Sequence, residues 1–227
     1  MIQNNNKINL NIENQENNDV FQGICIWREK SECANCSIND KLHCHVQLKY
    51  SLYFGVGFLT ALIPALLGIF FSRYEINLLF IILIGWFIYA LFFFCVWESR
   101  VLCSHCPYYA NHTQKTLHCD INRGAYKISK FHPEPMKKSE IIQFFIGVGI
   151  LIGYPIPILI IGKQFLMLIL TLIGIGIWIT IIQLKTCPVC VNFSCPFNRV
   201  PKEIVDEFLK LNPRMKIAWE ESGYKIE

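Results

Sequence analysis

Four apolar runs of 20 to 22 residues constrain this chain more than any other feature, because each contains no Asp, Glu, Lys, Arg or His. At about 1.5 Å per residue, an α-helix of this length crosses a hydrocarbon core of about 30 Å. Buried helices of soluble proteins rarely stay so apolar for so long. We therefore predict an all-α integral membrane protein with four transmembrane helices, at residues 50–71, 78–97, 141–161 and 165–184.

The composition agrees with a membrane protein. Hydrophobic residues make up 53% of the chain, charged residues only 17%, and the mean hydropathy is +0.35. Soluble domains carry about a quarter charged residues. A large apolar surface must therefore meet lipid, and the lipid bilayer is the first partner that the sequence predicts.

The connections between the runs are very unequal in length. Residues 72–77 join the first two runs and residues 162–164 join the last two, whereas about forty polar residues separate the pairs. Short connections favour antiparallel neighbours, so we predict two antiparallel hairpins. Four crossings then place the N-terminal region, the middle loop and the C-terminal tail on one side of the membrane.

Basic residues predict which side this is. Nineteen of the 21 Lys and Arg residues lie in those three segments, and only Arg73 and Lys163 lie in the short loops. Lys and Arg accumulate in cytoplasmic loops, so we expect a multi-pass protein of the cell membrane with both termini cytoplasmic. The predicted order is a disordered Asn-rich tail (1–20), a Cys/His cluster (21–49), hairpin 1 (50–97), a Cys/His loop (98–139), hairpin 2 (140–184), and a Cys cluster with an amphipathic helix at 201–211 (185–227).

Ten of the eleven cysteines and all six histidines lie in the predicted cytosolic segments. Each segment has one Cys-x-x-Cys pair with further Cys or His close by, and this spacing aims two thiolates at one cation. In a reducing cytosol such thiols do not persist as structural disulfides. The candidate ligands form three groups: Cys25, Cys33, Cys36 and Cys44; Cys103, Cys106 and Cys119; and Cys187, Cys190 and Cys195.

The first group can close a four-thiolate site alone, or with His43 or His45 in place of one cysteine. Each of the other groups is one thiolate short. Either the pairs that begin at Cys103 and Cys187 share an ion, or each group recruits a histidine, with His112, His118 and His132 as the available donors. The spacing leaves both arrangements open.

Zinc is the favoured metal, because it is redox-silent and commonly holds loop-rich segments together. Iron–sulfur clusters are the alternative, since four cysteine thiolates hold them as well. Cys106-Pro107 and Cys195-Pro196 resemble the Cys-Pro that ends ferredoxin cluster runs, but the full run of four closely spaced cysteines is missing. Free cysteines without metal remain the plain alternative.

No phosphate-binding loop, nucleophile elbow or HExxH motif is present, and no basic stripe interleaved with aromatics indicates nucleic-acid binding. Spans without ionisable residues argue against proton pumping. The sequence favours a non-enzymatic membrane scaffold whose metal-stapled segments dock a cytosolic protein partner. The alternatives are an iron–sulfur electron-transfer protein and a thiol-redox or metal-handling membrane protein. The sequence predicts no oligomeric state.

The second and fourth runs each end shortly before a Cys-x-x-Cys pair, and the first and third share a Gly-Val-Gly followed by proline. This pattern is compatible with duplication of a unit made of one hairpin and one Cys-x-x-Cys turn.

Overall fold

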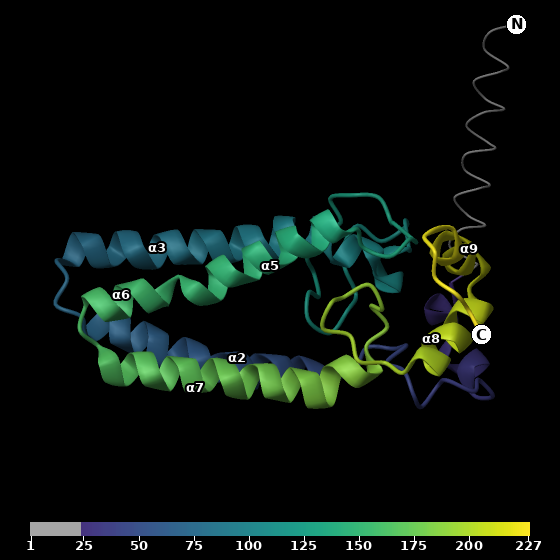
Figure 1. The fold of residues 1–227 in the computed structure, drawn as a ribbon, viewed down its shortest axis with the longest axis horizontal. Coiled ribbons are helices and arrows are strands. Elements are labelled where there is room, and N and C mark those ends of the chain that lie inside the picture. Colours follow the sequence, from purple (N-terminus) through teal and green to yellow (C-terminus); the bar gives the residue numbers. More distant parts are fainter. Residues whose placement is uncertain (1–23) are drawn as a thin grey trace, which may run out of the picture.

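The computed structural model describes residues 24–227, and four long helices lie side by side in it (Figure 1). The short connections lie at one end of the bundle, and all longer segments lie at the other. We call residues 24–47, 102–137 and 187–227, which gather at this second end, the head. The predicted Asn-rich tail and residues 21–23 lie outside the described residues.

All four predicted spans are confirmed as helices long and apolar enough to cross a membrane: Leu48–Phe71, Ile76–His105, Lys138–Ile161 and Phe165–Val189. Within the described chain the architecture is all-helical, apart from one isolated bridge between Thr116 and Tyr126. The elements of the spans are α2 (Leu48–Phe71), α3 (Ile76–Phe92), η3 (Phe93–Trp97), α4 (Glu98–Val101), α5 (Lys138–Gly153), α6 (Pro155–Ile161), α7 (Phe165–Ile181) and η6 (Ile182–Thr186).

Three spans are not uniform α-helices. The third span divides after Tyr154, because Pro155 has no backbone N–H to donate to an intrahelical hydrogen bond. Helix α6 therefore begins at Pro155. The second and fourth spans each pass through a five-residue π-helical segment, η3 and η6, just before the head. Such π segments often mark functional sites.

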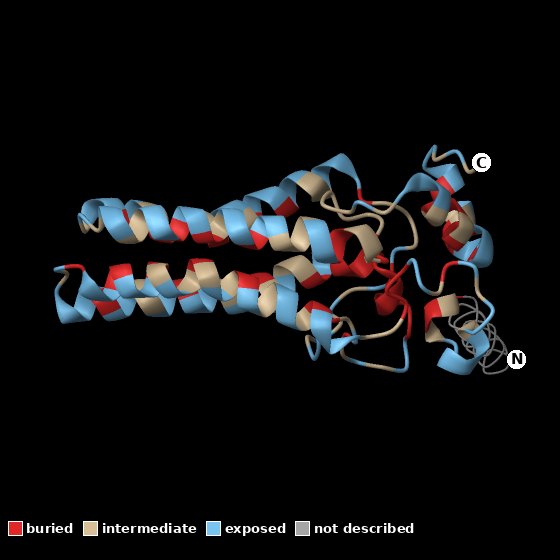
Figure 2. Cartoon of the chain, turned by 90° about the horizontal axis from the view of Figure 1, so that it is seen from below, coloured by how far each residue is buried: buried red, intermediate tan, exposed pale blue. Residues whose placement is uncertain are grey.

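Exposed residues run along the outside of the bundle (Figure 2), and many of them are large and apolar. Ile81, Phe87 and Leu166 are each more than 60% exposed. They lie on α3 and α7, which contain no charged residue. In water this surface would cost a large hydrophobic free energy, whereas lipid solvates it. The exposed apolar surface therefore supports a multi-pass membrane protein.

The tightest helix contact lies between α2 and α7. Gly57 of α2 packs under the Trp178 ring, and Gly174 of α7 packs directly on the backbone of Thr60. The Thr60 hydroxyl donates to the carbonyl of Gly174 at 3.0 Å. Small residues allow such close approach in membranes. Because α2 packs chiefly on α7 rather than on α3, the structure does not confirm the predicted hairpins as packing units.

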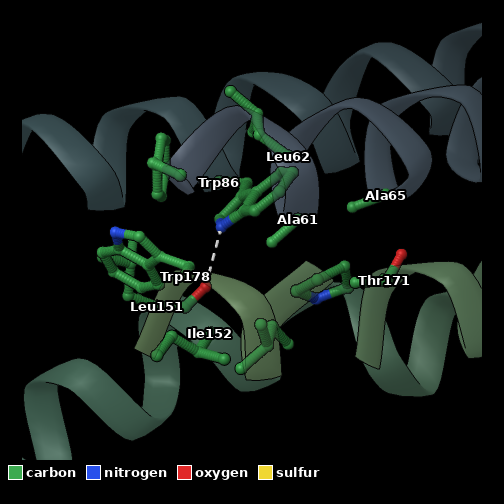
Figure 3. A pocket seen from close by; sticks show the side chains of 11 residues that line it. Ala61, Leu62, Ala65, Trp86, Leu151, Ile152, Thr171 and Trp178 are labelled. Carbon is green, nitrogen blue, oxygen red and sulfur yellow. Dashed lines mark hydrogen bonds between the residues drawn. The ribbon is translucent and has the colours of Figure 1, made fainter. Parts of the chain in front are cut away.

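A second set of contacts joins α3 to α5. The indole N–H of Trp86 donates to the carbonyl of Leu151 at 3.1 Å, and Tyr89 donates to the carbonyl of Gly147 at 3.0 Å. Trp86 and Trp178 also border a narrow apolar cavity in the bundle (Figure 3). Its lining comes from all four spans: Phe58, Ala61, Leu62, Ala65, Trp86, Leu151, Ile152, Pro155, Thr171, Ile175 and Trp178.

The head is built from short 3₁₀ turns and two terminal helices around its own core. The predicted amphipathic helix at 201–211 is confirmed as α8 (Lys202–Leu211), and α9 (Pro213–Glu221) follows it. Val205, Phe208 and Leu209 of α8 are buried. They pack in a core that includes Cys44, Cys103 and Cys106. The 3₁₀ turns are η1 (Cys25–Trp27), η2 (Lys30–Cys33), η4 (Cys103–His105), η5 (Pro107–Tyr109) and η7 (Cys187–Val189).

Candidate metal centres

The first cysteine group folds around two 3₁₀ turns, η1 and η2. The amide of Cys36 donates to the carbonyl of Cys33 at 3.1 Å, which closes the Cys-x-x-Cys turn. Burial first, and then the nearby thiols of Cys25, Cys33 and Cys36, together raise the pKa of Cys44 to about 12. The four sulfurs therefore lie within electrostatic reach of one another, and we call them cluster 1.

Asn212, between α8 and α9, fastens the C-terminal helices to cluster 1. It is completely buried. Its carbonyl oxygen accepts from the Cys25 amide at 2.7 Å, and its Nδ2 donates to the Cys25 sulfur at 3.3 Å and to the Phe208 carbonyl at 2.7 Å. A residue 187 positions away in sequence thus fixes one candidate ligand.

The other two Cys-x-x-Cys turns adopt the same backbone conformation. Leu102 and Thr186, which precede them, have φ and ψ of −107° and −51°, and of −106° and −49°. A 3₁₀ turn follows in each, and the second cysteines, Cys106 and Cys190, are both extended, with ψ of 136° and 128°. A π-helical segment precedes each turn, directly before Cys187 but separated by α4 from Cys103. The matching turn conformation is compatible with the duplication that the sequence suggested.

The structure brings the second and third cysteine groups together. The Asn192 side chain donates to the carbonyl of Leu102 at 3.3 Å, joining one turn to the other. Burial raises the pKa of Cys106 well above its ordinary value, and the thiols of Cys190, Cys119 and Cys195 add to the rise. We call the six converging thiols cluster 2: Cys103, Cys106, Cys119, Cys187, Cys190 and Cys195.

Asn122 connects two sulfurs of cluster 2. Its backbone N–H donates to the Cys119 sulfur at 3.2 Å, and its side-chain N–H donates to the Cys103 sulfur at 3.3 Å and to Glu98 at 3.0 Å. On the opposite side, Gln183 donates to the Cys187 sulfur at 3.7 Å. Donors of this kind hold thiolate ligands and tune the metal that they bind.

The clusters are joined through His43 and Asp120, both buried. His43 Nδ1 lies 2.7 Å from an Asp120 oxygen, and its amide donates to the Val189 carbonyl at 2.7 Å. Burial lowers the pKa of His43 to about 4, so the neutral ring donates Nδ1–H to the carboxylate. Its Nε2 has no hydrogen-bond partner among residues 24–227. Metal-ligating histidines typically have this arrangement.

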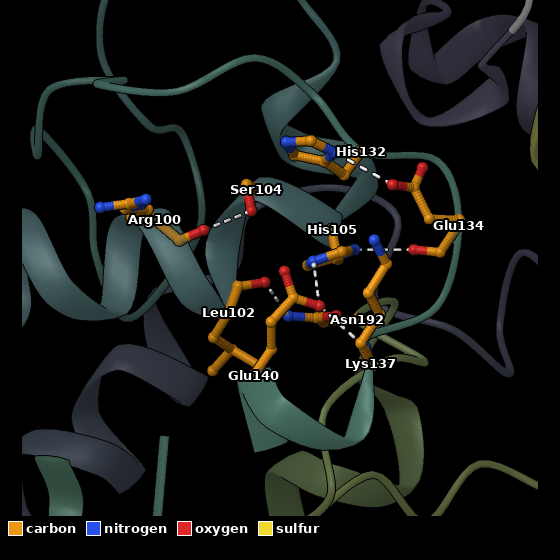
Figure 4. A network of polar contacts seen from close by, with 9 residues as sticks. All are labelled: Arg100, Leu102, Ser104, His105, His132, Glu134, Lys137, Glu140 and Asn192. Carbon is orange, nitrogen blue, oxygen red and sulfur yellow. Dashed lines mark hydrogen bonds and ion pairs between the residues drawn. The ribbon is translucent and has the colours of Figure 1, made fainter. Parts of the chain in front are cut away.

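His45 resembles His43 in that its buried Nε2 also has no hydrogen-bond partner among residues 24–227. The other four histidines lie in different surroundings. His112 lines a cavity with Lys127, and His118 lies 3.3 Å from the carbonyl of Thr116. His105 is buried, with Nδ1 2.7 Å from the Glu134 carbonyl and Nε2 3.5 Å from the Glu140 carboxylate (Figure 4). Figure 4 also shows His132 beside Glu134, at 3.0 Å. The contacts of these four histidines are thus with carbonyl, carboxylate and cavity groups.

As the side chains stand in residues 24–227, no three Cys, His, Asp or Glu form a group that could hold a metal ion. Burial raises the pKa of Cys119 to about 11, because it disfavours the charged thiolate. Rotation of a cysteine between staggered rotamers moves its sulfur by about 3 Å. A metal ion in either cluster would therefore require its cysteine side chains to rearrange, because their present positions form no such group.

Sequence reasoning found the cysteines but missed the side chains that position them, Asn122, Asn212 and Asp120. Asp120 and Asn122 carried a local signal, because they lie one and three residues after Cys119 in a loop rich in candidate ligands. Comparisons with protein-family models, with curated proteins and with solved structures found no match.

Proposed function

We propose that this chain is a cell-membrane protein with a cytosolic head that holds soft metal ions, zinc in the first place, and serves as a non-enzymatic scaffold for a protein partner. The observation that carries the proposal is cluster 2. Six cysteines from two segments distant in sequence gather in one region of the head, where Cys106 and Cys119 lie within electrostatic range of Cys190.

The head's construction supports a structural metal. It has no sheet in the described residues and only two helices of its own, α8 and α9. Small loop-rich domains bury too little apolar surface for stability without added crosslinks, and bound zinc supplies that stability in many such domains. Here cysteines occupy positions in the core itself.

Thiol number supports two kinds of site. Cluster 1 has the four thiols of a tetrahedral zinc site, with His43 as a further donor. The six thiols of cluster 2 match a two-zinc centre in which two thiolates bridge the ions, a Zn₂Cys₆ arrangement known from DNA-binding modules. The predicted alternative, in which His112 or His118 completes a three-cysteine group, receives no contact to support it.

Iron–sulfur electron transfer is the second candidate. The hydrogen bonds that Asn122 and Asn212 donate to cysteine sulfurs favour it, because N–H donors to sulfur set the reduction potential of such clusters. Electron transfer would use the head as a redox site rather than as a docking surface. A thiol-redox or metal-handling role is the third candidate.

Elemental analysis and an absorption spectrum test the proposal, on full-length protein purified anaerobically in detergent without added metal. We expect about two or three zinc ions per chain and no visible colour. Cys36→Ser should lose the ion of cluster 1, Cys106→Ser should lose the metal of cluster 2, and Cys95→Ser, in a span, should keep both. Iron with sulfide would contradict the zinc scaffold and support iron–sulfur electron transfer. A protein without metal would refute both proposals.

The scaffold role requires a partner that depends on the metal-loaded head. Crosslinking in native membranes, followed by mass spectrometry, should capture a partner protein with the unaltered chain and with Cys95→Ser, but not with Cys106→Ser.

Topology is tested by protease digestion of vesicles of defined sidedness. The head should be cut only from the cytosolic face, and cleavage from the opposite face would contradict the proposed orientation.

A further inference from the structure

The head has a polar cavity, separate from the cysteine clusters, that no part of the proposed function uses. It is open to solvent, has a volume of about 300 Å³, and is lined by Tyr109, His112, Gln114, Lys115, Tyr126, Lys127 and Ser129. This is the size of a small-ligand pocket. We propose that this cavity binds a phosphate monoester group, the chemistry shared by free phosphorylated metabolites and by lipid headgroups such as that of phosphatidic acid.

Local hydrogen bonds make the cavity a rigid feature. Residues 115–127 turn back on themselves, because the amide of Lys127 donates to the carbonyl of Lys115 at 2.9 Å. The opposite wall is fixed by Tyr109, whose hydroxyl lies 3.1 Å from the Ser129 hydroxyl and accepts the Ser129 amide at 2.9 Å. The two lysines therefore lie at the two ends of one loop, beside the isolated bridge between Thr116 and Tyr126.

The basic side chains of the cavity have no acidic ion-pair partner among the residues that the structure describes. Its lining contains two lysines and a histidine but no carboxylate. Among residues 24–227, neither Lys115 nor Lys127 lies within ion-pair distance of an acidic side chain. Arg214, at the start of α9, adds to the positive potential and helps to lower the pKa of His112, after burial and Lys127. A dianion would neutralise this excess.

Lys127 is the central donor. Its ammonium group donates to the carbonyl of Asn111 at 2.6 Å and lies 5.6 Å from the centre of the Tyr109 ring. An ammonium group has three donors, so others can reach a ligand. Burial lowers the pKa of Lys127 to about 8. A charge that is partly desolvated and without an acidic partner gains much from a bound anion.

The neutral lining favours a hydroxylated phosphate monoester over a bare ion. The buried Oε1 of Gln114 has no hydrogen-bond partner in the described part of the chain, and an unpaired buried polar atom is costly. A ligand hydroxyl would satisfy it, while the Ser129 and Tyr126 hydroxyls can donate to phosphate oxygens.

Calorimetric titration of the full-length protein in detergent tests the site, with glycerol 3-phosphate and inorganic phosphate as probes. Lys127→Met and Lys115→Met should each weaken binding by about tenfold or more, the loss expected for one charge-assisted hydrogen bond. Lys130→Met removes an exposed lysine near the cavity but outside its lining, and should bind as the unaltered chain does. Lys115 is exposed, so its variant keeps the test decisive if Lys127→Met misfolds.

Nanodiscs separate the two sources of the phosphate group. In phosphatidylcholine discs the probes should bind. If phosphatidic acid in the disc abolishes probe binding in the unaltered protein, the site takes a lipid headgroup, and if probe binding persists, it takes a soluble ligand. Absence of binding by both probes and by phosphatidic acid would overturn the proposal, as would equal loss in Lys127→Met and Lys130→Met. Neither result would touch the metal content, so the two proposals fail separately.

Discussion

Asn212→Ala should open the contact between the C-terminal helices and cluster 1. The substitution removes three hydrogen bonds and leaves the buried Cys25 amide and the Phe208 carbonyl without partners. One orphaned buried donor costs about 1–3 kcal/mol, and a lost hydrogen bond about 1 kcal/mol more. The free energy of local opening around Cys25 should therefore fall by about 2–4 kcal/mol.

Thiol labelling measures this opening directly. When reclosing is faster than alkylation, the labelling rate follows the population of the open state, and 1.4 kcal/mol corresponds to a factor of ten. Labelling of Cys25 should accelerate by about 30-fold to 1000-fold in Asn212→Ala, read peptide by peptide by mass spectrometry. Cys195, in cluster 2, provides the internal reference, because Asn212 does not contact it.

Asn35→Ala is the matched control, because Asn35 is an exposed asparagine of the same cysteine-rich segment. It should leave the Cys25 rate unchanged. If Asn212→Ala labels Cys25 no faster than Asn35→Ala does, then Asn212 does not hold cluster 1. If Cys195 accelerates equally, the substitution unfolds the whole head and the local account is wrong.

Three further predictions concern acid pH, helix packing and metal. Burial tends to raise the pKa of Asp206, but hydrogen bonds from Lys202, the Glu227 amide and Tyr224 hold it below the ordinary value. The ionised Asp206 therefore stabilises the fold fully above about pH 4, and this stabilisation is lost as pH falls through the folded pKa. The melting temperature of the head should fall over that pH range. In Asp206→Asn this acid-dependent fall should be absent. Gly174→Val should overpack against α2, reduce the stability of the bundle by about 1–3 kcal/mol or more, and so lower its melting temperature in detergent. A side chain at Gly176 meets nothing within 4 Å, so Gly176→Val should melt as the unaltered protein does. Chelation should expose the head cysteines to alkylation while far-UV circular dichroism keeps the helical signal of the spans, and unchanged alkylation would contradict a structural metal.

Local sequence properties predicted the spans closely. Apolar runs at residues 50–71 and 165–184 differ by two residues or fewer from the start of the corresponding spans in the structure. A hydrophobic span is a local property, since each segment partitions into lipid by its own side chains. The positions of the Cys-x-x-Cys turns and of helix α8 could also be predicted from local sequence, because cysteine spacing and the amphipathic period each extend over only about ten residues.

Packing partners were not local properties. Nothing in α2 alone indicates that Gly57 and Thr60 meet α7 rather than α3, because several glycines are spread over the spans and only relative helix rotation selects among them. Similarly, the spacing left open whether the second and third cysteine groups share a site. Their convergence depends on the lateral arrangement of two spans, which the chain decides only when all four helices pack.

The sequence by itself determined a four-span membrane protein with its cysteines gathered at one end. Hydropathy, charge bias and ligand spacing each act over a single segment, so no tertiary knowledge is needed to read them. Only the tertiary structure decided which thiols converge, which asparagines hold their sulfurs, and where unpaired lysines line a cavity. Those features join residues as far apart as Cys25 and Asn212, and contacts across such distances exist only after the chain has folded.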